Sequence, residues 1–197
     1  MTVMADGERT DEAPRWRGIH HLALTTNDMD ATVRFYHGVL GMRVVASIGV
    51  PSFKHYFFEV GPGNTVAFFQ YLGHDVGTIE KPAGVPPTYP TQFDHLSFHL
   101  PDEQALKDLQ DRLAEHAVEV TDIVDHQIMK SIYFTDPNGI ALEASYWVVD
   151  VTGRPANYRD HETAFVDLDP VPAMVELDKT GDLDWTPSTA LAGDADE

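Results

Sequence analysis

The sequence predicts an α+β fold built from two copies of one strand–helix–strand–strand–strand module. The segment Ile-His-His-Leu-Ala-Leu at 19–24 is repeated as Phe-Asp-His-Leu-Ser-Phe at 93–98, and each copy opens the same order of strand and helix patterns. The copies also carry possible metal ligands: His21 and His95 hold matching places, and Gln70 and Glu143 follow them by 49 and 48 residues. Two histidines and one carboxylate are the ligands of a mononuclear iron(II) site with open positions, so a metalloenzyme is the leading interpretation.

The first module begins with a strand at 18–25, where alternation places His21 on one face and two leucines on the other. Asn27 or Asp28 is suited to cap a helix expected at 29–39, since a short polar side chain can accept from the first free backbone N–H groups. A glycine then ends the helix. Three strands follow, at 42–49, 54–60 and 64–72.

The second module repeats this order. A strand is expected at 93–100, and Asp102 is suited to cap a helix at 103–116. Strands follow at 118–125, 130–135 and 139–147. The turn between the last two is Asp-Pro-Asn-Gly at 136–139, which is typical of a hairpin.

These patterns predict the domain organisation. One domain, 18–150, holds the modules 18–72 and 93–147, which are joined by a proline- and glycine-rich loop at 73–92. A loop of this length inside a compact domain is usually a functional lid or a linker. A flexible arm is expected at 1–17 and an irregular acidic extension at 151–197.

Composition restricts the function. The chain has no cysteine, which excludes disulfides, thiolate catalysis and cysteine-bound metals. Its formal charge of −19 disfavours nucleic acid and anionic lipid as partners. No apolar run approaches the roughly 18 residues of a membrane span, and the N-terminus lacks a signal-peptide pattern, so we expect a cytoplasmic protein.

Each candidate metal ligand can also be interpreted as a structural residue. A lone strand histidine is more often structural, but His21 and His95 recur at one place in a repeat. Glu143 lies between apolar neighbours, so we expect it to be buried, and a buried carboxylate needs a partner or a metal. Five aromatic residues could line a pocket or belong to the core: Phe53, Tyr56, Phe58, Phe68 and Trp147.

The chain resembles the vicinal oxygen chelate superfamily, which includes glyoxalase I, bleomycin-resistance proteins, fosfomycin-resistance enzymes and type I extradiol dioxygenases. The resemblance spans about residues 18–147 and is carried by four motifs. They are IHHLAL (19–24), ATVRFYHGVLGM (31–42), FDHLSFHL (93–100) and SIYFTDPNGIALE (131–143). It implies paired βαβββ modules forming a curled mixed sheet around a divalent metal, with His21, His95 and Glu143 as its ligands.

Within the superfamily the second module looks most like the catalytic half of extradiol dioxygenases. The resemblance assigns an acid–base role to Tyr133, which stands ten residues before Glu143 in an Ile-Tyr-Phe run. It also implies active-site roles for His74 and His126. The implied cofactor is Fe(II), with Mn, Co, Zn or Ni as alternatives, and the implied substrates are a small catechol and O2.

Other functions stay open. A glyoxalase-like lyase or isomerase would use Gln70 as a further ligand, whereas extradiol enzymes generally do not use that position. A bleomycin-resistance-type protein would bind a ligand without chemistry. A homodimer is expected from the resemblance alone.

Overall fold

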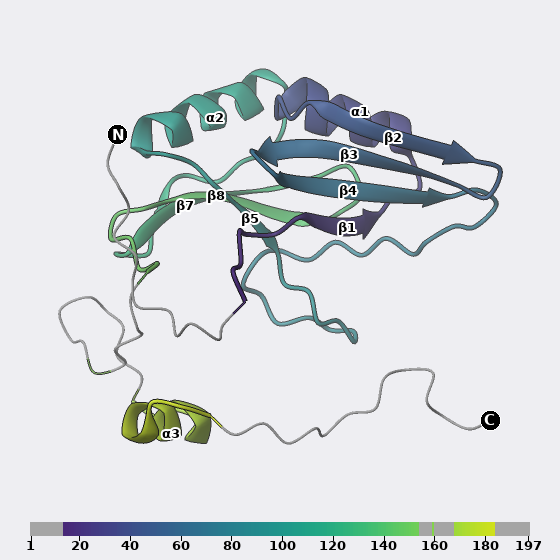
Figure 1. Cartoon of the computed structure of the whole chain (residues 1–197). Coiled ribbons are helices and arrows are strands. Elements are labelled where there is room, and N and C mark those ends of the chain that lie inside the picture. Colours follow the sequence, from purple (N-terminus) through teal and green to yellow (C-terminus); the bar gives the residue numbers. More distant parts are fainter. Residues whose placement is uncertain (1–13, 154–158, 160–167, 184–197) are drawn as a thin grey trace, which may run out of the picture. The chain divides into compact units, whose positions relative to one another are not determined.

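The computed structural model describes residues 14–153, 159 and 168–183. The chain divides into two compact units, Met1–Arg154 and Pro155–Glu197. The first unit holds both modules, each with a four-stranded sheet and its own helix (Figure 1). The predicted α+β architecture is therefore confirmed, and the two sheets are open.

The first module forms one mixed sheet with the strand order β1-β4-β3-β2, in which β1 runs parallel to β4. Its helical segment is an α-helical turn, α1, that continues as a π-helix, η1. The elements are β1 (His21–Thr25), α1 (Met29–Val33), η1 (Arg34–Val39), β2 (Val44–Val50), β3 (Phe53–Gly61) and β4 (Asn64–Tyr71).

The second module repeats this topology with the order β5-β8-β7-β6, and β5 runs parallel to β8. The strand expected at 118–125 is shorter than predicted, because only β6 and a single bridge from Val120 to Phe134 pair with β7. The elements are β5 (Leu96–His99), α2 (Glu103–Glu115), β6 (Val124–Asp125), β7 (Met129–Thr135) and β8 (Ala141–Trp147).

Both helices begin where the sequence predicts, at an aspartate. The side chain of Asp28 accepts from the backbone N–H of Ala31, and that of Asp102 accepts from Ala105. Each carboxylate satisfies an N–H that has no partner within the helix and lies at the positive end of the helix dipole. These caps start α1 and α2 shortly after β1, which begins at His21, and β5, which begins directly after His95.

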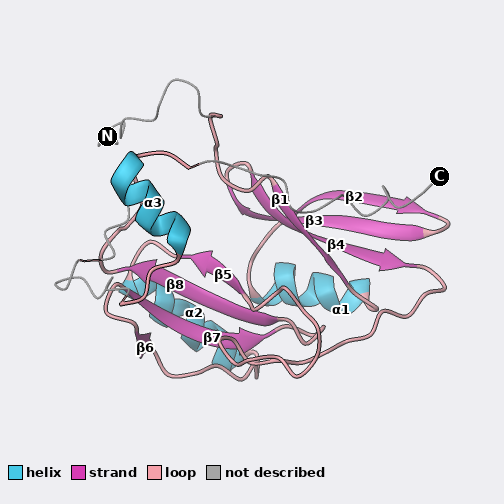
Figure 2. Cartoon of the chain, turned by 90° about the horizontal axis from the view of Figure 1, so that it is seen from below, coloured by secondary structure: helices cyan, strands magenta, loops and turns pink. Residues whose placement is uncertain are grey.

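The helices cover one face of the two sheets and bury the apolar side of each module (Figures 1 and 2). Tyr36 packs its ring 4.9 Å from that of Phe68 and 5.4 Å from that of Phe58, and all three are fully buried. Phe58 and Phe68 therefore belong to the core, and they do not line a pocket. The core continues into the second module through Leu106, Leu113, Ile132 and Leu142.

A buried polar network joins the two modules. It links the start of the helical segment in the first module to the turn before β8 in the second. The Tyr36 hydroxyl donates to Oδ2 of Asp136 at 3.1 Å, and the Thr26 hydroxyl donates to Oδ1 of Asn138 at 2.6 Å. Asn138 also donates through Nδ2 to Asp136 and to the Thr32 hydroxyl. Because buried polar groups are costly without partners, these contacts fix the turn of the second module against the first.

Gly139 ends that turn with φ +81° and touches the 73–92 loop. A Cβ here would lie 3.4 Å from the carbonyl oxygen of Ile79. We expect Gly139→Val to lower the free energy of unfolding by about 1–3 kcal/mol, since a β-branched residue is strained in this conformation. Urea unfolding measures the change. Gly49→Val in β2, where a Cβ meets no atom within 4 Å, is the matched control. Equal stability of both variants would contradict the assigned turn.

The unit Pro155–Glu197 contains the helix α3 (Pro172–Thr180) among its described residues. Pro172 opens it, where a missing N–H costs nothing, and Gly181 caps it with φ +75°. The prediction of irregular structure after residue 150 is therefore wrong for 172–180. No helix in the described ranges is long and apolar enough to cross a membrane.

Candidate metal centre

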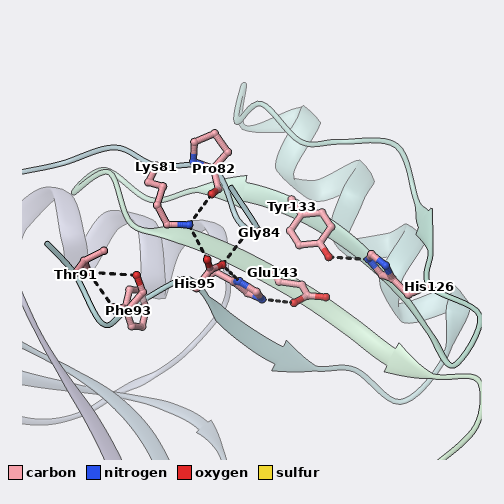
Figure 3. Close-up of polar contacts among 10 residues, drawn as sticks. Lys81, Pro82, Gly84, Thr91, Phe93, His95, His126, Tyr133 and Glu143 are labelled. Atoms are coloured by element: carbon pink, nitrogen blue, oxygen red, sulfur yellow. Dashed lines mark hydrogen bonds and ion pairs between the residues drawn. The ribbon is translucent and has the colours of Figure 1, made fainter. Parts of the chain in front are cut away.

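The structure brings His95 and Glu143 together on the second sheet (Figure 3). Glu143 lies in β8, which pairs with β5 on one side and β7 on the other, and it is only 3% exposed. Nε2 of His95, just before β5, lies 2.8 Å from Oε2 of Glu143. The predicted burial of Glu143 is thus confirmed, and its first partner is a predicted co-ligand.

The second oxygen of Glu143, Oε1, is buried and has no hydrogen-bond partner among the described residues. An ionised carboxylate with a free buried oxygen is costly unless a cation or a proton compensates it. An imidazole nitrogen beside such a carboxylate is a donor set suited to a first-row divalent metal. His95 and Glu143 are therefore suited to two of the three ligand positions that the superfamily resemblance implies.

A second carboxylate holds the other side of the His95 ring. Oδ1 of Asp94 lies 2.5 Å from Nδ1 of His95 and also accepts from the backbone N–H of Gly84. Oδ2 accepts from the Lys81 ammonium at 2.8 Å. Lys81 first, then Gly84 and His95, hold the pKa of Asp94 well below its usual range. Asp94 is therefore an ionised carboxylate at neutral pH.

Tyr133 stands directly across from Glu143, because β7 and β8 pair these two residues in register. Its hydroxyl lies 2.8 Å from Nε2 of His126, in the segment before β7. The Tyr133 and His95 rings meet edge to face at 6.2 Å. Burial, and then the charge of Glu143, raises the pKa of the Tyr133 phenol, so it keeps its proton at neutral pH. His95, Glu143, Tyr133 and His126 thus form one group.

His21 and His74 do not join this group within one chain. His21 is exposed on β1, with Nδ1 2.8 Å from Nδ1 of His20 and its ring 5.7 Å from that of Phe57. His74 is exposed in the turn after β4. The part of the chain that the structure describes contains no group of three or more His, Asp or Glu side chains placed to hold a metal. The three-ligand set therefore stays a prediction.

Gln70 does not match Glu143, so that part of the repeat comparison is wrong. Glu143 pairs with Ser97, two residues after His95, and the residue paired with Ala23, two after His21, is Ala67. Gln70 instead turns to the helix face. Its amide binds the backbone at the start of α1, accepting from Met29 N and donating to the carbonyl of Asn27.

The first module keeps the histidine but not its neighbours. Where Tyr133 faces Glu143 in the second module, Phe57 faces Ala67 in the first. Around Phe57, aromatic rings gather on the His21 face of the sheet. The buried His55 ring lies 4.3 Å from that of Phe57 and 3.5 Å from that of Phe69. This face therefore carries two histidines, His21 and His55, among aromatic side chains.

Two residues of the site were missed in the sequence. Asp94 directly precedes His95, and a carboxylate next to a proposed ligand is a signal that could have identified it. Lys81 lies in an irregular loop, and no local pattern indicates that its ammonium reaches Asp94.

Comparisons with known proteins identify the family and similar folds. A protein-family model described as the Glyoxalase/Bleomycin resistance protein/Dioxygenase superfamily matches residues 18–144. This match covers both modules and confirms the resemblance carried by the sequence motifs. The solved glyoxalase/bleomycin resistance protein/dioxygenase domain from Frankia sp. EAN1pec has a similar fold, with a TM-score of 0.58 at 23% identity. The alignment covers 67% of this chain and 93% of that one.

Two curated relatives are similar in sequence. MhqE of Bacillus subtilis (strain 168), described as a candidate ring-cleaving dioxygenase, is 33% identical over 70 residues, 32% of this chain. The match spans only 23% of the length of MhqE. The metallothiol transferase FosB of Lysinibacillus sphaericus (strain C3-41) is 26% identical over 132 residues, which cover 64% of this chain and 80% of FosB.

Proposed function

The chain belongs to the glyoxalase/bleomycin resistance protein/dioxygenase superfamily, and we propose that it is a ring-cleaving dioxygenase of the extradiol type. Its substrates would be a small catechol and O2. The observation that carries the proposal is the contact of Tyr133 with His126 at 2.8 Å, directly across the strand pair from Glu143. A proton donor and a base beside a metal-binding carboxylate are what a diol needs on binding.

The superfamily typically binds a divalent metal. Here His95, Glu143 and His21 would hold it, and Fe(II) is the ion that we propose, with Mn, Co, Zn or Ni as alternatives. When bound, such an ion would act as a Lewis acid toward the diol and would activate O2.

We assign proton transfer to the side chains near the proposed metal ligands. Tyr133 keeps its hydroxyl proton at neutral pH and, with that proton donated to His126, would accept a hydrogen bond from a substrate hydroxyl. His126, in contact with the same hydroxyl, would take up the proton that the substrate releases, through Tyr133. We assign His74 a further proton-transfer role on the resemblance alone. The aromatic bed of Phe57, Phe69 and His55 supports a flat, apolar substrate.

We further propose that His21 reaches the site from a second copy of the chain. The basis is that His21 is exposed and contacts His20 and Phe57, whereas His95 and Glu143 already meet each other. In a two-fold symmetric dimer the same contact occurs twice, so each copy would complete the site of its partner.

A metal-dependent transferase is the second candidate, because the similarity to FosB covers most of that protein. A glyoxalase-like lyase or isomerase also remains among the alternatives. Gln70 gives the lyase no support, since both ends of its amide bind backbone groups. Neither alternative consumes O2.

Tyr133→Phe is expected to lower kcat/KM for the catechol by about 10²–10⁴-fold, the usual range for loss of a positioned proton-transfer group. Metal affinity should stay unchanged, because the hydroxyl is not a proposed ligand. Steady-state oxygen uptake measures the first effect and chelator competition the second. Tyr146→Phe, which removes a hydroxyl bound to Glu103 instead, is the matched control. Unchanged turnover in Tyr133→Phe would remove the proposed role.

The proposed function is tested by oxygen uptake. The protein is reconstituted anaerobically with Fe(II), mixed with a panel of catechols, and followed for O2 consumption and yellow ring-cleavage product. Uptake with product supports the dioxygenase. A bound metal without uptake for any diol favours the transferase or the lyase. Absence of metal binding favours a protein that binds its ligand without chemistry.

A further inference from the structure

The loop at 73–92 contains a lysine in an unusual environment. Lys81 is only 8% exposed, although lysine is among the residues least often buried. Its ammonium lies 2.8 Å from Oδ2 of Asp94 and 2.9 Å from the carbonyl oxygen of Pro82. The loop thus delivers a buried cation to the carboxylate beside His95.

The Asp94 carboxylate is held by three groups. Lys81 binds Oδ2, and the backbone N–H of Gly84 and the His95 ring both bind Oδ1. Two of these groups belong to the loop and the third is a proposed metal ligand. The carboxylate therefore connects the loop to the metal centre through direct contacts.

The first half of the loop is anchored at two points. Near its start, Val76 exchanges two hydrogen bonds with the Asn27 side chain, at 2.7 and 2.9 Å. Further along, the backbone of Ile79 and Glu80 lies against Gly139. These contacts limit where Lys81 can lie, so its position relative to Asp94 is set by both modules.

We propose that Asp94 and Lys81 are positioning residues of the metal centre, which makes the 73–92 loop part of that centre; the inference rests on the proposed metal-dependent function. With a metal bound, Nδ1 of His95 would donate to Asp94, and Nε2 would be the nitrogen that binds the metal beside Glu143. A carboxylate in this place orients the ring and makes it a better ligand. Lys81 does not contact His95. It acts indirectly, by holding the Asp94 carboxylate in place.

The first test measures binding of Co2+ to the full chain by competition with a chromophoric chelator, which requires no turnover. Asp94→Asn should weaken Co2+ about 10–100-fold, the usual cost of losing an outer partner of a ligand histidine. Lys81→Met should weaken it in the same direction by a smaller factor. In the Asp94→Asn background, Lys81→Met should not weaken Co2+ further. Lys81 is proposed to influence His95 only through the Asp94 carboxylate, which this background already lacks.

Two controls separate this role from general charge or stability. Asp30→Asn and Lys107→Met remove charges from exposed ion pairs on α1 and α2. They should leave Co2+ affinity unchanged. Thermal unfolding of every variant is measured alongside, and Lys81→Gln replaces Lys81→Met if the latter does not fold.

Hydrogen exchange on the metal-free protein gives a second readout. The Gly84 amide is bound to Asp94, so Asp94→Ala should speed exchange in the segment around Gly84 while the segments of β4 stay as in the wild type. Lys81→Met should produce a weaker change in the same segment.

The outcomes distinguish the inference from the proposed function. If His95→Ala lowers Co2+ affinity but Asp94→Asn does not, the positioning role is overturned and the metal site stands. If Lys81→Met has the same effect with and without Asp94, Lys81 does not act through that carboxylate. If His95→Ala leaves Co2+ affinity unchanged, both proposals are overturned. If Asp94→Asn weakens Co2+ but no diol consumes O2, the positioning role stands and the dioxygenase does not.

Discussion

Glu143→Gln is expected to abolish turnover and to weaken metal binding by more than about 100-fold, because loss of a ligand exceeds the 10–100-fold cost of losing an outer partner. The substitution keeps the shape of the side chain and a possible hydrogen bond to His95. It removes the negative charge and one of the two oxygens that the buried site presents. Since a buried charge is costly, the thermal stability of the metal-free variant should equal or exceed that of the wild type.

Metal content after dialysis and oxygen uptake with Fe(II) measure the two losses. Glu59→Gln is the matched control, because Glu59 is a strand carboxylate paired with Arg43 and lies in the other module. It should retain metal and activity. Full metal content in Glu143→Gln would show that Glu143 is not a ligand.

The same variant tests whether two copies share the site. His21→Ala and Glu143→Gln should each be inactive alone. After the two proteins are mixed and allowed to exchange subunits, each heterodimer would contain one site with all ligands and one with two defects. A random mixture would then recover about a quarter of wild-type activity, as two-fold symmetry requires. If mixing restores no activity although subunits exchange, the two modules of one chain must supply the whole site.

Asp136→Ala is expected to lower the free energy of unfolding by about 3–4 kcal/mol, which places it among the more damaging single substitutions. The carboxylate accepts four hydrogen bonds: from the Tyr36 hydroxyl, the Asn138 side chain, and the backbone N–H groups of Asn138 and Ile140. Asp136 is 4% exposed and Tyr36 is fully buried, so water cannot easily replace the lost acceptor. Several donors would be left buried without partners.

Urea unfolding gives the change directly. Tyr36→Phe removes one of the four donors and should cost about 1 kcal/mol. Asp30→Ala breaks an ion pair in which both side chains are about three-quarters exposed, and it should cost less than about 1 kcal/mol. If Asp136→Ala is no more damaging than Asp30→Ala, the network between the modules does not hold them together.

Local patterns in the sequence predict most of the fold. The alternation of strands, the caps at Asp28 and Asp102, and the Asp-Pro-Asn-Gly turn each depend on residues a few positions apart. The same is true of the apolar neighbours of Glu143, which predict its burial. Such signals act through hydrogen bonds and packing within one element, so they can be interpreted without knowing its neighbours.

Counting along the chain fails where strands carry irregularities. Gln70 follows His21 by 49 residues, but the position that corresponds to Glu143 is Ala67, three residues earlier. A shift by an odd number of residues moves a side chain to the other face of a sheet. In the first module the pairing of β2 with β3 and of β3 with β4 is interrupted by register shifts. The regular pairing of β1 with β4 places Ala67, and not Gln70, opposite Ala23, which follows His21 by two residues.

The sequence by itself determined the two βαβββ modules, their helix caps, and the presence of a histidine, a glutamate and a tyrosine suited to a metal-dependent reaction. Only the tertiary structure decided which of them meet. His95, Glu143 and Tyr133 are joined by strand pairing, whereas His21 stays apart on the other sheet. It also decided that Lys81 binds Asp94 and that Tyr36 binds Asp136. Contacts between distant segments depend on how sheets and loops pack, and no local pattern encodes that packing.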